Sequence, residues 1–289
     1  MISAGLFYGQ YVSQYDARAC ANNSASQSNE SNQLLLGVNE GLAASRLHLQ
    51  ITRWSGAGSG RFLSWVKQQV TLERPVIIGV YMNSSYFGGT GDSEYDHIVP
   101  VTGVGTKRPP GDLVYDANDT LTFSDNGLVG GDTPSSSPYF FTSAFGAFQR
   151  TRFQADAAGA PPYSLAKSGT NYGFAVTGVM DAYAETVPVT LSTSVNYESP
   201  AIREGSSTRP AASPLVLTIR VSGLKPGVSY RLYRYSTLAS VPNGSFNASA
   251  VRAARTWSIQ IASGSTFSTT ETISSKDVAV YRAVPASAR

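Results

Sequence analysis

The spacing of apolar residues predicts helices in the first quarter of the chain. Residues 15–31 and 32–50 carry small or apolar side chains three and four positions apart, which is typical of one helix face packed on a neighbour. Residues 60–73 repeat this spacing and stop before Pro75, which cannot continue a helix. The chain up to Arg74 is therefore predicted to be mainly helical.

Beyond Arg74 the apolar residues gather into short runs rich in Val, Ile and Tyr. Such runs, closed by Gly, Asn or Asp, indicate strands, here at residues 75–82, 96–105, 112–119 and 171–181. Residues 121–141 are rich in Gly, Ser and Pro and show no period, so we interpret them as a long surface loop. Helices followed by a sheet predict an α+β domain, which we place at residues 1–183.

The last third of the chain shows strand patterns alone. They recur at residues 187–198, 214–224, 227–236, 256–264 and 276–284. This spacing is typical of an all-β sandwich, which we place at residues 184–289. Within it, "VSGLKPGVSYRLYR" resembles a fibronectin type III domain, in which a Leu-x-Pro-Gly-x-x-Tyr turn joins two strands.

Composition and charge exclude several classes of partner. Charged residues make up only 14% of the 289 positions, the net charge is +3, and no Lys/Arg run occurs, so neither nucleic acid nor an anionic membrane is an expected partner. The longest apolar run, residues 76–82, falls far short of the ~20 residues that span a bilayer. One cysteine and two histidines do not make a typical zinc site, and no phosphate-binding loop precedes a helix, so no metal or cofactor is expected.

Six asparagines begin an Asn-x-Ser/Thr triplet, the acceptor of N-linked glycans in secreted proteins. Together with the low charge, they favour a secreted or extracellular glycoprotein. The six are Asn22, Asn29, Asn83, Asn118, Asn243 and Asn247.

Cys20 is the only cysteine, so it is a buried filler, an intermolecular link or a reactive thiol. A nucleophilic cysteine needs a base, and histidine is the natural one because it titrates near neutral pH. His97 begins a predicted strand and is the better candidate for that base. His48 follows a helical leucine, and we interpret it as structural or solvated.

Two further residues complete a candidate constellation for acyl transfer. Asp116, at the end of the predicted strand 112–119, would orient the imidazole, with Asn118 as the alternative. Gln14, six positions before the cysteine, offers a side-chain amide for the oxyanion of a tetrahedral intermediate. A cysteine near a helix N-terminus would add its own N–H and a lowered thiol pKa.

The order of these elements resembles the papain-like cysteine peptidases over residues 1 to about 183. "Q-x-x-x-x-x-C" together with "RPVIIGVY…DHIVPVTGV…LVYDAND" is most similar to the group related to bacteriocin leader-processing peptidases. The resemblance implies that Cys20 is the nucleophile, His97 the base, Asp116 the orienting residue and Gln14 the oxyanion-hole residue.

Two functional interpretations remain open. In the first, the chain is a secreted papain-like thiol hydrolase that cleaves peptide bonds in a peptide or protein substrate. In the second, it is a secreted papain-fold glycoprotein without catalysis, with a structural, adhesive or self-assembling role. The second is kept because the thirteen residues after Cys20 are polar apart from two alanines, where the resembled family has an apolar helix.

Overall fold

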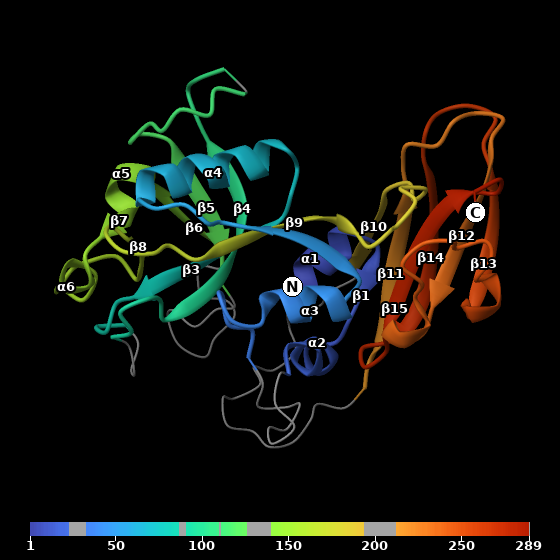
Figure 1. Ribbon diagram of the computed structural model, residues 1–289, viewed down its shortest axis with the longest axis horizontal. Coiled ribbons are helices and arrows are strands. Elements are labelled where there is room, and N and C mark those ends of the chain that lie inside the picture. Colours follow the sequence, from blue (N-terminus) through green and yellow to red (C-terminus); the bar gives the residue numbers. More distant parts are fainter. Residues whose placement is uncertain (23–32, 87–90, 110, 126–139, 194–211, 289) are drawn as a thin grey trace. The chain divides into compact units, whose positions relative to one another are not determined.

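The computed structural model describes residues 1–22, 33–86, 91–109, 111–125, 140–193 and 212–288. The fold is mixed α/β with mostly antiparallel sheets (Figure 1). Two compact units divide the described residues: unit 1 takes 1–50, 178–193 and 212–288, and unit 2 takes 51–177. The expected boundary between residues 183 and 184 differs from this division, since the first 50 residues group with the C-terminal strands.

Unit 1 has short N-terminal helices and two antiparallel sheets. The strands are ordered β1-β15-β12-β13 in one sheet and β10-β11-β14 in the other. The elements are α1 (Ile2–Phe7), β1 (Gln10–Tyr11), α2 (Gln14–Ala21), α3 (Glu40–Arg46), β10 (Val189–Thr193), β11 (Pro214–Val221), β12 (Ser229–Tyr235), η1 (Leu238–Ser240), η2 (Ala250–Arg252), β13 (Arg255–Gln260), β14 (Phe267–Ser274) and β15 (Ala279–Pro285).

Contacts distant in sequence hold the N-terminal segment in unit 1. Gln10 pairs with Val280 of β15, and the Tyr281 amide donates to the Gly9 carbonyl at 2.7 Å. Arg282, only 2% exposed, donates from Nη1 to the Tyr8 carbonyl at 3.0 Å, and burial lowers its pKa to about 10. A two-residue strand carries no periodic signal, so this pairing could not be predicted from the sequence.

Both sheets of unit 1 contribute to one apolar core. Leu217 and Ile219 of β11 and Leu232 of β12 are fully buried in the same cluster as Tyr281 of β15. Strand β11 alternates between buried and exposed residues over most of its length and β14 mainly between half-buried and exposed ones, as expected for sheets with one solvated face. Strand β14 was absent from the strands predicted for this region.

Unit 2 is built on a larger sheet that continues β2-β9-β3-β4-β5-β6, with β8 pairing β3 and β7 pairing β8. The unit boundary falls within β2 and near the end of β9. The elements are β2 (Leu49–Arg53), α4 (Ser59–Thr71), β3 (Val76–Met82), β4 (His97–Gly105), β5 (Thr120–Ser124), β6 (Phe140–Ala144), α5 (Phe145–Phe148), β7 (Gln149–Arg150), α6 (Arg152–Ala155), β8 (Tyr163–Ala166) and β9 (Gly173–Val179).

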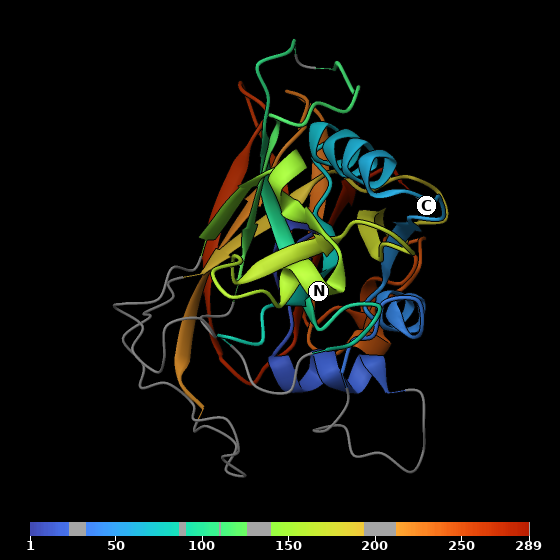
Figure 2. The same cartoon turned by 90° about the vertical axis from the view of Figure 1, so that its left-hand side faces the viewer.

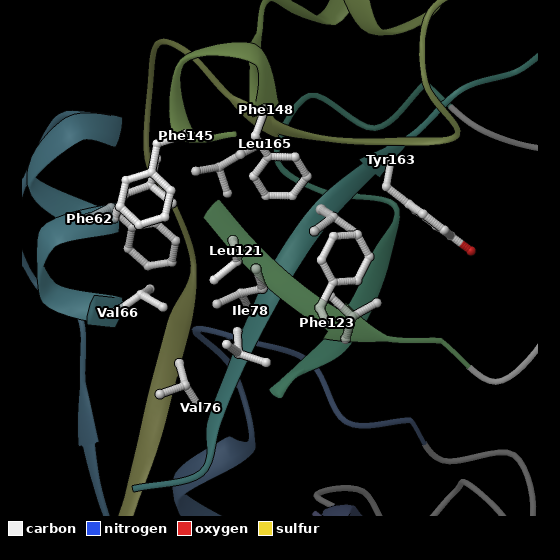
Figure 3. Close-up of a cluster of buried hydrophobic side chains, with 14 of the residues drawn as sticks. Phe62, Val66, Val76, Ile78, Leu121, Phe123, Phe145, Phe148, Tyr163 and Leu165 are labelled. Atoms are coloured by element: carbon white, nitrogen blue, oxygen red, sulfur yellow. The ribbon is translucent and has the colours of Figure 1, made fainter. Parts of the chain in front are cut away.

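Helix α4 packs along one face of this sheet, as both ribbon views show (Figure 1 and Figure 2). Its buried residues Phe62, Leu63 and Val66 lie at helical spacing and contact the strand residues Val76 and Ile78. Figure 3 shows this apolar cluster, with the Tyr163 hydroxyl pointing away from it.

The structure confirms some predicted elements and corrects others. The helix predicted at 60–73 and the strands at 75–82, 96–105 and 171–181 are present as α4, β3, β4 and β9. Residues 112–119, predicted as a strand, form turns stabilised by Asp side chains that accept from the backbone amides of Val114 and Asn118. The predicted loop 121–141 instead contains most of β5 and the beginning of β6; its residues 126–139 lie outside the described residues.

Of the helix predicted at residues 15–31, the structure describes only the first part, which is helical and forms most of α2. Residues 32–50 contain α3 and the beginning of β2, so the predicted helix there is shorter than its apolar pattern suggested.

Within the part of the chain that the structure describes, no helix is both long and apolar enough to cross a membrane.

Candidate functional site

A buried carboxylate holds the imidazole of His97 in unit 2. His97 begins β4, and Asp125 directly follows the end of β5, the next strand along the chain. The His97 Nε2 and Asp125 Oδ1 atoms are 2.9 Å apart, and the side chains are 19% and 0% exposed. A carboxylate on one ring nitrogen orients the imidazole and leaves the other nitrogen, Nδ1, for proton transfer.

Tyr163 completes this cluster from the first position of β8. Its hydroxyl donates to Asp125 Oδ2, and its ring stacks on that of His97 with the centroids 6.1 Å apart. Burial, followed by the hydrogen bond and charge of Asp125, raises the pKa of Tyr163 well above its usual range, so the phenol stays protonated. Each carboxylate oxygen of Asp125 therefore has its own hydrogen-bond partner: Oδ1 faces the His97 ring nitrogen, and Oδ2 accepts from the Tyr163 hydroxyl.

The carboxylate that contacts His97 is thus Asp125, whereas the sequence pattern predicts Asp116 in that position. Asp116 accepts from Arg108 Nε at 3.1 Å and from the Asn118 amide at 2.9 Å, in the turn before β5. These hydrogen bonds hold the pKa of Asp116 below its usual value. The alternative, Asn118, donates from its side chain to Asp116.

Cys20 is the second-to-last residue of α2 and is 5% exposed. Burial raises the pKa of its thiol to about 11; the Arg46 guanidinium lowers it and the Asp16 carboxylate raises it by smaller amounts. The C-terminal end of a helix also carries partial negative charge, which disfavours a thiolate. The environment expected for a nucleophile, a helix N-terminus and a lowered pKa, is therefore not the one that Cys20 occupies.

Gln14 is the first residue of the same helix. Six residues of α-helix correspond to a rise of ~9 Å and a rotation of about 240°, so Gln14 and Cys20 point in different directions from opposite ends of α2. This geometry does not bring the Gln14 amide to the Cys20 thiol. The sequence pattern places Gln14 just before a helix at residues 15–31, whereas the helix begins at Gln14 itself.

Cys20 lines a cavity of about 390 Å³ in unit 1, together with Asp16, Arg46, His48 and Leu238 among others. The ring nitrogens of His48 already lie close to oxygen atoms: Nδ1 is 2.7 Å from Asn243 Oδ1 and Nε2 is 2.9 Å from the Leu238 carbonyl. Both ring nitrogens of His48 therefore face groups other than the Cys20 thiol. These contacts support the structural interpretation of His48.

The six glycosylation triplets differ in how accessible their asparagines are. Asn83 is 1% exposed, and its Nδ2 atom donates to the Ala160 carbonyl at 2.9 Å. The Nδ2 atom of Asn247 donates to the Ala288 carbonyl at 2.7 Å and to the Pro285 carbonyl at 3.1 Å. Asn118 and Asn243 are exposed and Asn22 is half-buried, whereas Asn29 lies outside the described residues.

We expect Asn83 and Asn247 to be unmodified in protein from its natural source. A glycan is attached through Nδ2, so modification would break these hydrogen bonds and force a large polar group into the interior. Enzymatic deglycosylation in ¹⁸O-water followed by peptide mass spectrometry checks this. Quantitative labelling at Asn83 or Asn247 in folded protein would contradict it, and Asn118 and Asn243 serve as the exposed comparison.

Among the described residues, no group of three or more His, Cys, Asp or Glu side chains is arranged to hold a metal ion. The site that the structure brings together therefore consists of His97, Asp125 and Tyr163. Comparisons with protein-family models, with curated proteins and with solved structures gave no match to this chain.

Proposed function

We propose that the chain is a hydrolase of peptide bonds in which His97 transfers protons and Asp125 orients it. The observation that carries the proposal is the 2.9 Å contact between the His97 ring and a carboxylate with no solvent exposure. An imidazole held in this way can accept a proton from a nucleophile and return it to the leaving group. The choice of peptide bonds rests on the papain-like order of sequence elements.

The topology of unit 2 supports the same proposal. In the resembled family a histidine begins one strand and an aspartate lies near the end of the next, and β4 and β5 place His97 and Asp125 in that relation. Tyr163 fixes the second oxygen of Asp125, so the carboxylate has one preferred orientation. Such preorganisation is what a catalytic imidazole needs, since a misplaced base loses much of its effect.

A surface protein without catalysis is the second candidate, and the state of Cys20 favours it. A thiol whose pKa is raised to about 11 is almost entirely protonated at neutral pH and is a poor nucleophile. If no reaction requires Cys20, the resemblance to the papain-like peptidases would reflect a shared fold without a shared catalytic activity.

Hydrolysis of a fluorogenic peptide library by the full chain, compared with His97→Ala and His48→Ala, separates the two candidates. We expect His97→Ala to lower kcat/KM by about 10²- to 10⁴-fold, the usual contribution of a general base. His48→Ala is the matched control, because it removes the only other histidine. Absence of hydrolysis by the unsubstituted protein would favour the non-catalytic candidate, and equal loss in both variants would contradict the role of His97 as the base.

Cys20 is expected to react slowly with iodoacetamide at pH 7 and faster as the pH approaches 11. The thiolate is the reactive form, and a pKa of about 11 leaves far less thiolate at pH 7 than an ordinary thiol with a pKa of ~8.5 would have. Mass spectrometry of the native protein from pH 6 to 11 gives the rate, with urea-unfolded protein as the control. Rapid labelling of the native protein at pH 6 would instead indicate a stabilised thiolate.

A further inference from the structure

Strand β14 lies at the end of its sheet with its outer edge open. The sheet order is β10-β11-β14, and no strand in the described parts of the chain pairs with the other side of β14. Its eight residues pair with β11 in unbroken register, from Phe267 opposite Val221 to Ser274 opposite Pro214. An open edge presents free N–H and C=O groups, which favour pairing with a further strand.

Strand β14 has little of the usual protection against such pairing. Edge strands are normally guarded by charged residues, proline, a bulge or short length, and the sequence "FSTTETIS" offers one charge, the inward-facing Glu271, and none of the others. Its single charge, Glu271, accepts from the Tyr281 hydroxyl at 2.6 Å and pairs with Arg234 Nε at 3.4 Å. An approaching strand therefore meets no uncompensated charge.

Other edges in unit 1 are better protected. Strand β10 directly follows Pro188, which cannot donate a ladder hydrogen bond. Strand β13 begins with Arg255, whose guanidinium lies 4.4 Å from the centre of the Trp257 ring. Among the described residues, strand β14 is thus the longest edge of the two sheets.

The sequence of β14 is complementary to itself when read in the opposite direction. A two-fold axis through Thr270 would place exposed residues with hydroxyl groups opposite one another. It would also place Phe267 opposite Ile273, and both of these apolar residues pack in the core. No like charges would face each other. The opposed pairs are Phe267 with Ile273, Ser268 with Thr272, Thr269 with Glu271, and Thr270 with its own copy.

From this edge and its self-complementarity we propose that a second copy of the chain docks on β14 in antiparallel register about Thr270. The two three-stranded sheets then form one continuous sheet across the dimer. Association through one pair of strands is weak, because a two-stranded pairing alone is only marginally stable in water. The dimer is therefore concentration-dependent.

Cross-linking at the two-fold axis tests the register. In a Cys20→Ser background, Thr270→Cys places two thiols opposite each other at a Cα separation of about 4.5 to 5.5 Å, within the range of a disulfide. The matched control is Thr218→Cys, since Thr218 is the register partner of Thr270 on the same exposed face but on β11, which is paired on both sides. Under mild oxidation we expect a disulfide-linked dimer for Thr270→Cys and monomer for Thr218→Cys.

Sedimentation equilibrium of the full chain tests the interface without a cross-link. We expect the unsubstituted protein to dimerise as its concentration rises, Thr270→Lys to raise the dissociation constant at least tenfold, and Thr218→Lys to leave it unchanged. Circular dichroism confirms that each variant is folded. A monomer at every soluble concentration, equal weakening by both lysines, or equal cross-linking of both cysteine variants would overturn the proposal.

Discussion

Replacing Lys67 with alanine is expected to lower the free energy of unfolding of unit 2 by about 3 to 5 kcal/mol, the usual effect of breaking a buried ion pair. Lys67 Nζ lies 2.7 Å from Asp119 Oδ2, and the two side chains are only 4% and 2% exposed. The substitution leaves a carboxylate in the interior without its cation. Total stabilities of about 5 to 15 kcal/mol are typical of domains, so the expected loss is a large fraction.

Hydrogen exchange measured by mass spectrometry reports the stability of each unit separately. We expect faster exchange in peptides from β3 and β4 of unit 2 and no change in those from β12 of unit 1. The double variant Lys67→Met with Asp119→Leu should recover most of the loss, because an apolar pair of similar volume removes the unpaired charge. Unchanged exchange in Lys67→Ala would contradict the burial of this pair.

Arg108 offers a matched control for the buried pair. It contacts Asp112 at 3.2 Å and Asp116 at 3.1 Å, and its side chain is 40% exposed. Solvent and salt screen such surface pairs, so Arg108→Ala should leave the exchange pattern of unit 2 close to that of the unsubstituted protein. A difference between Lys67→Ala and Arg108→Ala therefore measures burial and not charge alone.

Local patterns in the sequence predicted those elements that depend on local packing. The apolar face of α4 and the Val- and Ile-rich run of β3 could be recognised because their periodicity reflects burial against a single core. His97 could be chosen because it begins a strand of this kind. The pairing of β1 with β15 could not, because it joins residues about 270 positions apart through a strand of two residues.

The sequence pattern predicts Asp116, with Asn118 as the alternative, whereas the carboxylate that contacts His97 is Asp125, and this difference has a physical reason. Residues 112–119 contain Val and Tyr, but their Asp and Asn side chains accept from nearby backbone amides and stabilise turns instead of a strand. The segment "TLTFSD" carried the correct signal, since Leu121 and Phe123 alternate with polar residues and are buried. The Gly- and Ser-rich residues that follow hid this short strand.

Asp125→Asn is expected to lower kcat by about 10²- to 10⁴-fold with little change in KM, if the peptide hydrolysis proposed above is present. The amide is nearly the same size as the carboxylate and still accepts from Tyr163, so the fold should be retained. With its single oxygen accepting from Tyr163, the amide presents its NH₂ group to His97 Nε2 and removes the negative charge that stabilises an imidazolium. Asp125 is thus a positioning residue, acting through His97.

The matched control is Asp116→Asn, which changes the other candidate carboxylate by the same single atom. Asp116 contacts Arg108 and Asn118, so we expect its variant to keep the kcat of the unsubstituted protein. A pH profile separates orientation from folding: Asp125→Asn should lower the maximum rate and alter its pH dependence, while melting stays similar. Equal activity of Asp125→Asn and Asp116→Asn would show that the contact between His97 and Asp125 supports the fold of unit 2 and not a reaction.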